Sequence, residues 1–464
     1  MSPTGQRPAL DLSTPVSVHV VGIGGAGMSA IATVLAAMGH TVTGSDLKDS
    51  PVMDRLRAAG LEVSVGHRPE HVGEPDVVTV SSAVGASNPE VGEARRRGIP
   101  VLARAETLAA IAALRRCIAV GGTHGKTTTA SMLALLLVEA GLHPSFIIGG
   151  DVNEIGTNAV WDDGEWLVVE ADESDGSFLS LAPAVAVVTN VEADHLDHYG
   201  TFGAVRDAFE SFLASASLAR VVGGDDPEAA AIARRVGAET VGTSDSCTRR
   251  MVDLVPARSS VAFDLVDAAG ARLGHLAVPV PGVHNARNAA VAAVAGMAAG
   301  VPFEVAARAL ARFAGVARRF EFRGSASGVT FVDDYAHLPT EVAAALAAAA
   351  DGGWRRVVAV FQPHRYSRTA ALGAAFGAAF GDADVVVVTD VYGAGEPPIP
   401  GVSGRVVAEA VRRASPDKEV HYVPHRPELR GVVASVLRPG DLCCTLGAGD
   451  LTSLPDELLS DPGW

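Results

Sequence analysis

Short runs of β-branched residues alternate with alanine- and leucine-rich stretches along the chain, and this alternation restricts its fold more than any other feature. Residues 17–22, 41–46 and 76–82 predict strands, and residues 25–39 predict a helix between the first two strands. Strands that alternate with helices favour a parallel sheet with helices on both faces. The sequence therefore predicts an α/β fold.

Two features of this pattern indicate domain boundaries. Residues 251–280 contain strand-like runs and turn residues without a helical stretch, which is typical of antiparallel strands, and a new β–α series begins near Gly328. A chain of 464 residues has room for about three domains. We place the domain boundaries near residues 116 and 324, which divides the chain into 1–116, 117–323 and 324–464.

The composition narrows the class of protein. A formal net charge of −16 argues against a nucleic-acid partner, because phosphate backbones attract basic surfaces. The four cysteines show no C-x-x-C spacing, which suits a reducing cytoplasm. The start of the chain lacks a signal-peptide pattern, and the longest uncharged apolar stretch, residues 288–303, is too short to cross a bilayer. We expect a cytoplasmic protein without membrane insertion, and its oligomeric state remains open.

A first glycine loop follows the first predicted strand. Gly22, Gly24 and Gly27 match the pattern G-x-G-x-x-G, and Asp46 ends the next strand at about the distance expected for a ribose-binding acid. Glycines let the backbone approach a pyrophosphate, whose charge the following helix N-terminus favours. A dinucleotide, a nucleotide sugar, or close strand–helix packing without a ligand would each explain the loop.

A second glycine loop departs from the usual P-loop pattern. Gly125, Lys126 and Thr127 match its end, but Val120 stands where the first glycine is expected, so the loop is shorter. The Lys126 ammonium could reach β- and γ-phosphates, and the Thr127 hydroxyl could hold Mg²⁺. The chain has only three lysines, which favours a specific role for this one over a solvated lysine in a glycine-rich turn.

Carboxylates follow the next two predicted strands. Glu170 ends an apolar strand and begins a run of four carboxylates within residues 170–175, and a later strand is followed by Asp194 and His195. Because the carboxyl ends of parallel strands form the ligand crevice of an open sheet, these groups should lie near the second loop. Carboxylates beside a triphosphate suit Mg²⁺. A solvated acidic loop is the alternative.

Taken together, these motifs resemble the Mur ligase family. The resemblance spans residues 17–450 and rests on GTHGKTTT (122–129), EADESDGSF (170–178) and NVEADHLDHY (190–199), and on GIGGAGMSAIA (22–32), GVARRFEF (315–322), DDYAHLPTE (333–341), FQPHRYSRT (361–369) and DVYGAGEPPIPG (390–401). It implies three domains: a Rossmann-like domain over residues 1–116, a P-loop-ATPase-like α/β domain with a small antiparallel section over 117–323, and a Rossmann-like α/β domain over 324–464. It also implies an ATP-dependent amide ligase of peptidoglycan synthesis that works through an acyl-phosphate. The motifs are most similar to those of members that join L-alanine to UDP-N-acetylmuramate.

The resemblance implies three sets of binding residues. Those for the UDP-sugar would be Gly22, Gly24, Gly25, Ala26, Gly27, Asp46, Ser81, Ser82 and Arg104. Those for ATP would be Gly122, Thr123, His124, Gly125, Lys126, Thr127, Thr128, His284, Asn285, Asn288, Arg319 and Asp334. Those for the amino acid would be His337, His364, Arg365 and Arg368.

Catalysis would depend on Lys126, Glu170, His195, Arg319 and His337, with Thr127, Glu170 and His195 around Mg²⁺. We favour Glu170 over Glu173 as a metal ligand, because Glu170 lies at the strand tip nearest the loop. If their segment is helical, Arg365 and Arg368 share one face and would bind a carboxylate, the alternative being a salt-bridged surface helix. Asn285 could instead cap its own helix.

The sequence departs from the family pattern in two places. Leu338 stands where the second histidine of D-D-Y-x-H-H-P-T-E is usual, which leaves open an amino acid or amine other than L-alanine. No lysine lies between Lys126 and Lys418, so the carbamylated lysine of several relatives has no counterpart, and Arg206 lies near its expected place.

Three other functions compete with the ligase. An NAD-dependent oxidoreductase built on residues 1–115 leaves the acid and arginine clusters unexplained. A folylpolyglutamate synthase lacks the N-terminal glycine-loop domain, and in it Gly-Ser typically follows the Gly-Lys pair. The third is a non-enzymatic nucleotide sensor, which only a demonstration of catalytic turnover would exclude.

Overall fold

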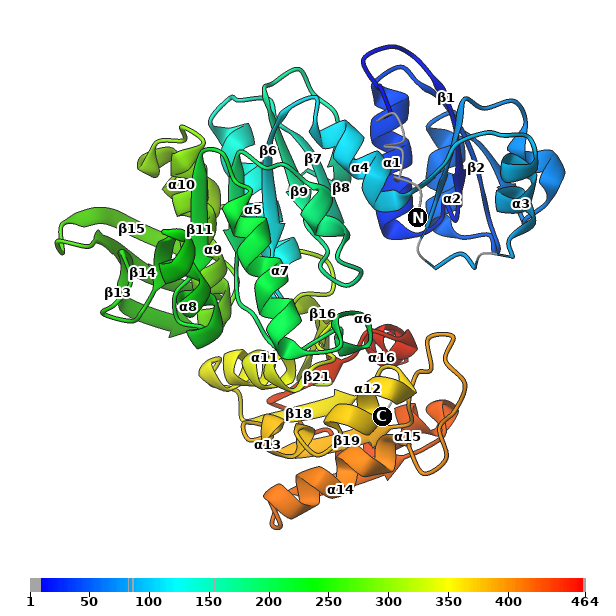
Figure 1. Cartoon of the computed structure of the whole chain (residues 1–464). Helices are drawn as coiled ribbons and strands as arrows, with labels where there is room; N and C mark the ends of the chain where they lie inside the picture. Colours follow the sequence, from blue (N-terminus) through cyan, green and yellow to red (C-terminus); the bar gives the residue numbers. More distant parts are fainter. Residues whose placement is uncertain (1–9, 82, 86, 154, 462–464) are drawn as a thin grey trace. The chain divides into compact units, whose positions relative to one another are not determined.

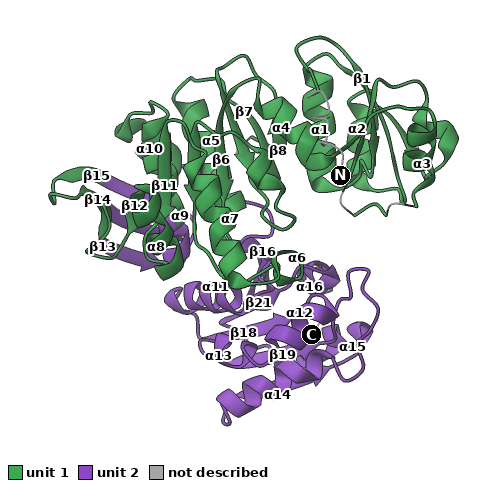
Figure 2. Cartoon of the chain, viewed as in Figure 1, with its two compact units in different colours: residues 1–252, 265–274, 288–310 green, residues 253–264, 275–287, 311–464 purple. Residues whose placement is uncertain are grey.

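The computed structural model describes residues 10–81, 83–85, 87–153 and 155–461 (Figure 1). The chain divides into two compact units (Figure 2). The first contains residues 1–252, 265–274 and 288–310, and the second contains residues 253–264, 275–287 and 311–464. Within the described residues, every helix is too short or too polar to span a bilayer.

The first sheet has five parallel strands in the order β3-β2-β1-β4-β5. Its strands are β1 (Ser17–Val21), β2 (Thr41–Asp46), β3 (Glu62–Val65), β4 (Val77–Val80) and β5 (Val101–Ala103). The accompanying helices are α1 (Ala26–Ala37), α2 (Pro51–Ala58), α3 (Pro89–Arg96) and α4 (Arg104–Ala112). The predicted strands and first helix are therefore confirmed. Four of the five residues of β1 are buried, as expected of a central strand covered by helices on both faces.

The second sheet has ten strands in the order β15-β14-β13-β12-β11-β10-β6-β9-β7-β8. The strands that flank the second glycine loop are β6 (Arg116–Gly121), β9 (Trp166–Glu170) and β10 (Val185–Val188), followed outward by β7 (Ser145–Val152), β8 (Thr157–Val160), β11 (Ala219–Gly223) and β12 (Glu239–Gly242). The helices are α5 (Lys126–Glu139), α6 (Leu196–Tyr199), α7 (Phe202–Ala214), α8 (Pro227–Val236), α9 (Val283–Ala298) and α10 (Phe303–Leu310). β6 pairs in parallel with both β9 and β10.

The antiparallel section predicted at residues 251–280 forms the end of this sheet. It contains β13 (Arg249–Ala257), β14 (Ser260–Asp267) and β15 (Arg272–Val278), which are neighbours in the sheet order and are joined by short turns. β7 and β8 also pair antiparallel, which the sequence pattern did not indicate.

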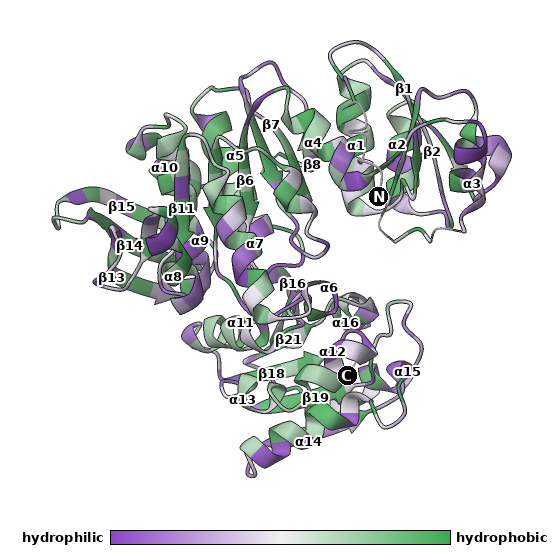
Figure 3. Ribbon diagram, viewed as in Figure 1, coloured by the Kyte–Doolittle hydropathy of each residue, from purple (hydrophilic) through white to green (hydrophobic). Residues whose placement is uncertain are grey.

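The third sheet has six strands in the order β16-β17-β21-β18-β19-β20. Its parallel strands are β17 (Val329–Asp334), β18 (Arg356–Phe361), β19 (Val385–Thr389), β20 (Glu419–Val423) and β21 (Asp441–Leu446), as the β–α series that begins near Gly328 predicts. The edge strand β16 (Glu321–Ala326) runs antiparallel to β17 and was not predicted. The helices are α11 (Pro339–Asp351), α12 (Tyr366–Leu372), α13 (Phe376–Ala379), α14 (Gly404–Ala414), α15 (Arg426–Val436) and α16 (Leu454–Leu459). Central strands such as β18 and β19 are hydrophobic along their length (Figure 3).

A buried carboxylate ties the first sheet together. Glu90 of α3 is fully buried, and its Oε2 accepts a hydrogen bond of 2.5 Å from the Ser45 hydroxyl of β2 and lies 3.3 Å from Nε2 of His19 in β1. Its Oε1 accepts a hydrogen bond of 3.0 Å from the backbone N–H of Arg68. Burial alone would raise the pKa of Glu90, but these hydrogen bonds outweigh it and lower the pKa to about 2.

We expect Glu90→Ala to lower the free energy of unfolding by about 3–5 kcal/mol, because His19 and Ser45 would keep buried polar groups without their partner. Since the pKa of Glu90 is lowered from 4.5 to about 2, its stabilisation is complete above pH 4.5 and is lost as the pH falls through about 2. Chemical denaturation at pH 7 measures the difference. Glu93→Ala, on the same helix, is the control, and equal losses for both variants would contradict the assignment.

Candidate functional site

The second glycine loop joins β6 to α5 through backbone conformations that side chains rarely adopt. Gly122 has φ +128° and Gly125, the residue before α5, has φ +79°. A Cβ at Gly125 would lie only 2.5 Å from Oδ1 of Asn288, so the loop passes close to that amide. The loop thus leads directly into the N-terminus of α5, where backbone N–H groups favour an anion.

Lys126 is mostly buried and bonds to the loop that carries it. Its Nζ donates hydrogen bonds to the carbonyl oxygens of Gly122 (2.6 Å) and Thr123 (3.2 Å) and to Oε1 of Glu173 (2.9 Å). Burial works against the ammonium charge, but Glu173 and Glu170 outweigh burial and raise the pKa of Lys126. The lysine is therefore a fixed cation at the mouth of the loop.

Glu170 and Thr127 lie together, at the position that the sequence predicts. Glu170 is the last residue of β9, and its Oε1 accepts a hydrogen bond of 3.1 Å from the Thr127 hydroxyl. Its Oε2 accepts a hydrogen bond of 2.8 Å from the backbone N–H of Gly149. A carboxylate and a hydroxyl thus converge beside the start of α5.

Glu173 contributes a feature that the sequence reasoning missed when it preferred Glu170. Only 3% of the residue is exposed, and among the described residues its Oε2 has no hydrogen-bond partner. Nε2 of His195 lies 3.8 Å from its Oε1. Burial raises the pKa of Glu173 although Lys126 lowers it. Glu173 is one of the four carboxylates within residues 170–175, but the sequence does not show that it is buried.

The donor set of this site fits Mg²⁺. A threonine hydroxyl, the carboxylate of Glu170 and the unpartnered oxygen of Glu173 are hard oxygen ligands of the kind that this ion prefers. His195 stands at the edge of the set, with its Nε2 3.4 Å from Oδ2 of Asp194.

The loop is also bound to the residues that follow β10. The backbone N–H of His124 donates a hydrogen bond of 2.8 Å to Oδ1 of Asn190, and the Thr123 hydroxyl accepts one of 2.9 Å from the backbone N–H of Glu192. Thr128 is buried in the first turn of α5. Three neighbouring strand ends therefore shape one surface, as the β–α pattern predicts.

Four further residues of the predicted ATP set belong to the second unit: His284, Asn285, Arg319 and Asp334. Asn285 donates its side-chain amide to the Pro281 carbonyl oxygen at 2.7 Å, so it bonds to the start of its own helix. Asp334 accepts hydrogen bonds of 2.8 Å from the backbone N–H groups of Phe320 and Ala336, and burial raises its pKa to about 6.

Two cations influence His284 in the same unit. Burial, followed by the charges of Arg287 and Arg319, lowers the pKa of His284 to about 4, so its ring is neutral at pH 7. The Arg319 guanidinium lies 5.2 Å from the centroid of the Tyr335 ring.

The first glycine loop is bound to Asp46, the acid that the sequence predicts at its ribose site. The Gly24 N–H donates a hydrogen bond of 2.9 Å to Oδ2 of Asp46, and a Cβ at Gly27 would lie 2.9 Å from Nη1 of Arg104. Arg104 also donates a hydrogen bond of 3.0 Å to Asp172 in the acidic run after β9. Gly25 and Ala26 lead into α1, Ser81 follows β4, and Ser82 lies outside the described residues.

The predicted helical pairing of the two arginines is wrong. α12 begins at Tyr366, and Arg365 precedes it with φ +69°, a conformation outside the helical region, so only Arg368 lies on the helix. Arg368 Nη1 lies 3.1 Å from Nδ1 of His364. The backbone N–H of Arg365 donates a hydrogen bond of 2.8 Å to the Tyr392 carbonyl oxygen, and this bond fixes the turn.

The second unit brings His337 and His364 together. Their ring centroids lie 5.8 Å apart, and the ring of Tyr392 stacks on His364 at 5.9 Å with an interplanar angle of 10°. Leu338 is buried immediately before α11. Tyr392 and Glu341 belong to the sequence motifs, but the sequence did not predict that they lie beside the two histidines.

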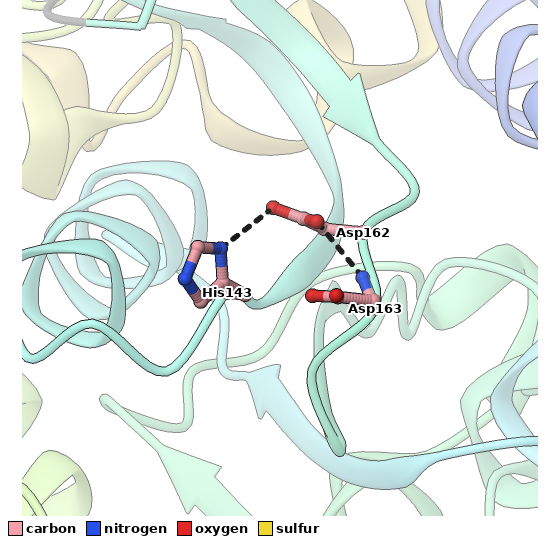
Figure 4. A group of neighbouring side chains, drawn as sticks. All are labelled: His143, Asp162 and Asp163. Atoms are coloured by element: carbon pink, nitrogen blue, oxygen red, sulfur yellow. Dashed lines mark hydrogen bonds and ion pairs between the residues drawn. The ribbon is translucent and has the colours of Figure 1, made fainter.

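Within the described part of the chain, a further group of metal-ligand side chains consists of His143, Asp162 and Asp163, whose ligand atoms lie within 4.8 Å of one another (Figure 4). His143 follows the C-terminal end of α5, a helix of 14 residues and thus roughly 20 Å long, whereas Lys126 begins it. His143 and Asp163 are exposed, and His143 already lies 3.6 Å from Asp162. The group is separate from the loop site, and we assign it no role.

Three family models match successive parts of the chain. The family model described as "Mur ligase family, catalytic domain" matches residues 17–116, the Mur ligase middle domain matches 120–296, and the Mur ligase glutamate ligase domain matches 318–449.

Individual relatives cover nearly the whole chain. The UDP-N-acetylmuramate–L-alanine ligase of Saccharopolyspora erythraea is 49% identical over 96% of this chain and 93% of its own length. That of an Anaeromyxobacter strain is 47% identical over 96% of this chain and 98% of its own. The crystal structure of UDP-N-acetylmuramate-alanine ligase from Thermotoga maritima is 29% identical, with a TM-score of 0.82 over 96% of this chain and 98% of that one.

We expect Gly125→Ala to destabilise the protein and weaken ATP binding more than Gly141→Ala. Both glycines have positive φ, which costs another residue roughly 1–2 kcal/mol, but only at Gly125 would the new methyl group meet a neighbour, Asn288. The clash adds about 1–3 kcal/mol. Thermal denaturation and ATP calorimetry measure both effects, and equal behaviour of the two variants would contradict the proposed close contact.

Proposed function

This chain belongs to the Mur ligase family, and we propose that it joins L-alanine to the carboxylate of UDP-N-acetylmuramate while ATP is converted to ADP and phosphate. The observation that carries the proposal is the buried Lys126–Glu173 pair beside Thr127 and Glu170, because it combines a phosphate-binding cation with hard oxygen ligands. The relatives at 47–49% identity support the choice of substrates. The reaction belongs to an early step of peptidoglycan synthesis in the cytoplasm.

Each proposed domain has its own substrate. Residues 1–116 would bind the UDP-sugar, with the loop from Gly22 to Gly27 around the pyrophosphate and Asp46, Ser81, Ser82 and Arg104 as further contacts. Residues 117–323 would bind ATP, and residues 324–464 would bind the amino acid. The bond between Gly24 and Asp46 supports the first assignment, because it holds the loop in a fixed shape before a ligand arrives.

The ATP phosphates would replace the loop's own carbonyl groups as partners of Lys126. Its Nζ now bonds to Gly122 and Thr123, and phosphate oxygens are stronger acceptors for an ammonium group. Thr127, Glu170 and His195 would hold Mg²⁺, which supplies positive charge to the phosphates when it is bound. The unpartnered oxygen of Glu173 favours a cation at this place and makes Glu173 a further candidate ligand.

Other residues would complete the nucleotide site. His124 and Thr128 belong to the loop and the first turn of α5, and Asn288 lies against Gly125, where its amide could read the adenine edge. In the second unit we propose His284 and Asn285 for the adenine, Arg319 for the γ-phosphate charge, and Asp334 for the nucleotide.

The chemistry consists of two transfers. The substrate carboxylate attacks the γ-phosphorus, ADP leaves, and the resulting acyl-phosphate is then attacked at its carbonyl carbon by the amine of the amino acid. The chain forms no covalent bond in either transfer. It contributes alignment and positive charge, which carry most of the catalysis in phosphoryl transfer. His337, His364, Arg365 and Arg368 would bind the amino acid.

We expect the purified protein to release ADP only when UDP-N-acetylmuramate and an amino acid are both present, and L-alanine to exceed glycine and L-serine. A coupled ADP assay with a panel of amino acids tests this order. An absence of product with all three would contradict the L-alanine assignment, and product with another amine would favour the alternative, a paralogue with a related carboxylate substrate. Leu338→His should leave the preference unchanged.

We expect Lys126→Ala to lower ADP formation by about a hundredfold or more, because it removes the cation that faces the phosphates. Calorimetry should show the affinity for UDP-N-acetylmuramate nearly unchanged, since that site is proposed on another domain. Lys418→Ala is the control, because Lys418 donates its hydrogen bonds to backbone carbonyls of the second unit. Loss of UDP-sugar affinity in Lys126→Ala alone would contradict the domain assignment.

A further inference from the structure

The hydrogen bonds of His337 determine which of its ring nitrogens carries the proton. Nδ1 lies 3.0 Å from the Tyr335 carbonyl oxygen and 3.3 Å from Oε2 of Glu341. Both partners are acceptors, so Nδ1 must be the donor, and in the neutral ring Nε2 then keeps a free lone pair. Glu341 is itself fixed, because its Oε2 also accepts from the backbone N–H groups of His337 (2.9 Å) and Leu338 (3.1 Å).

The hydrogen bond of His364 requires the opposite tautomer to that of His337. Nδ1 lies 3.1 Å from Nη1 of Arg368. A guanidinium group only donates, so Nδ1 of His364 must be the acceptor, and the ring proton lies on Nε2. The neighbouring Tyr392 ring stacks on the imidazole and restricts its orientation.

Both rings are neutral at pH 7. For His337, burial lowers the pKa, Glu341 raises it, and the cations Arg368 and Arg319 lower it, with a net decrease. For His364, burial lowers the pKa to about 4, assisted by His337, Arg368 and Arg365 and opposed by Glu396. Two adjacent neutral rings can therefore hold different tautomers.

We propose that Glu341 is a positioning residue for His337, and that Arg368, besides its proposed contact with the carboxylate, positions His364. The two rings are thereby held in opposite tautomers, so that the pair offers one lone pair and one N–H to the incoming amino acid. A zwitterionic amino acid needs this combination: its ammonium donates and its carboxylate accepts. The inference rests on the proposed function and deepens it, because it assigns the proton acceptor and explains why two histidines lie side by side.

The proton balance follows from the tautomers. The ammonium group gives one proton to Nε2 of His337, which becomes an imidazolium whose charge Glu341 stabilises. The freed amine forms the C–N bond, the C–O bond to phosphate breaks, and phosphate leaves with that electron pair and takes the second amine proton. His364 keeps its Nε2 proton throughout and donates it as a hydrogen bond to the carboxylate, beside Arg368.

Long-range ¹⁵N NMR of the full-length protein, labelled at histidine and free of ligand, tests the tautomers directly. The variants His337→Gln and His364→Gln assign the two signals. We expect a protonated Nδ1 for His337 and a protonated Nε2 for His364. The opposite tautomer at either ring, or two charged rings at pH 7, would overturn the inference. Correct tautomers without turnover of L-alanine would contradict only the proposed function.

The positioning roles have kinetic consequences. Glu341→Gln keeps a carbonyl acceptor but loses the charge, so we expect kcat to fall about tenfold, the acid limb of the pH profile to move to lower pH, and the amino-acid KM to change little. Arg368→Met should release the His364 tautomer and raise the amino-acid KM about tenfold.

Glu419→Gln is the matched control, because Glu419 accepts from His421 at 2.8 Å in an exposed pair of the same unit. It should leave the tautomers and the pH profile unchanged. A pH profile of Glu341→Gln that coincides with that of the unmodified protein, or a fall in kcat that Glu419→Gln reproduces, would overturn the role of Glu341.

Discussion

The register of β6 against its two neighbours determines the geometry of the proposed phosphate site in the first unit. Val120 pairs with Glu170 of β9, and Gly121 pairs with Val188 of β10, so the three strands end at the same level. A shift of one residue would turn Glu170 to the other face of the sheet, because side chains alternate along a strand. The bond between Thr127 and Glu170 depends on that register. The first turn of α5 supplies Lys126 and the Thr127 hydroxyl, and the neighbouring strand β9 supplies the carboxylate of Glu170 that the hydroxyl contacts.

The sequence predicted the location of this site but not its internal contacts. Strand ends and carboxylate runs are visible in the order of residues, because the carboxyl ends of parallel strands share one edge. The partner of Lys126 is not visible, since Glu170, Asp172 and Glu173 all lie in one short run. Only packing separates them: Glu173 is buried against the lysine, whereas Asp172 bonds to Arg104. The same limit applies to Arg365, whose left-handed backbone removes it from the helix that its spacing suggested.

The fold was predictable where strands alternate with helices and less so at sheet edges. β17, β18, β19 and β21 were visible as apolar runs, because strands buried on both faces require them. The edge strand β20, EVHYV, is only partly buried and was predicted from its β-branched and aromatic residues. The edge strand β16, with the sequence EFRGSA, is half exposed and includes a glycine and charged residues, so it lacks that signal. β8, TNAV, is likewise an edge strand, and its four residues are too few and too polar to give that signal. Edge strands are defined by the neighbour they pair with more than by their own composition.

The leucine at position 338 leaves the proposed amine chemistry intact. Glu341 contacts this residue through its backbone N–H, which every residue except proline provides, so the network around His337 does not depend on the side chain at 338. The Leu338 side chain is buried and brings no donor or acceptor that would compete for Nε2 of His337. A second histidine at this place would add another titratable group beside a ring whose pKa burial and nearby cations already lower. In the proposed chemistry, the proton acceptor and its tautomer are thus set by Glu341 and Tyr335, and the buried side chain at position 338 contributes packing without a titratable group.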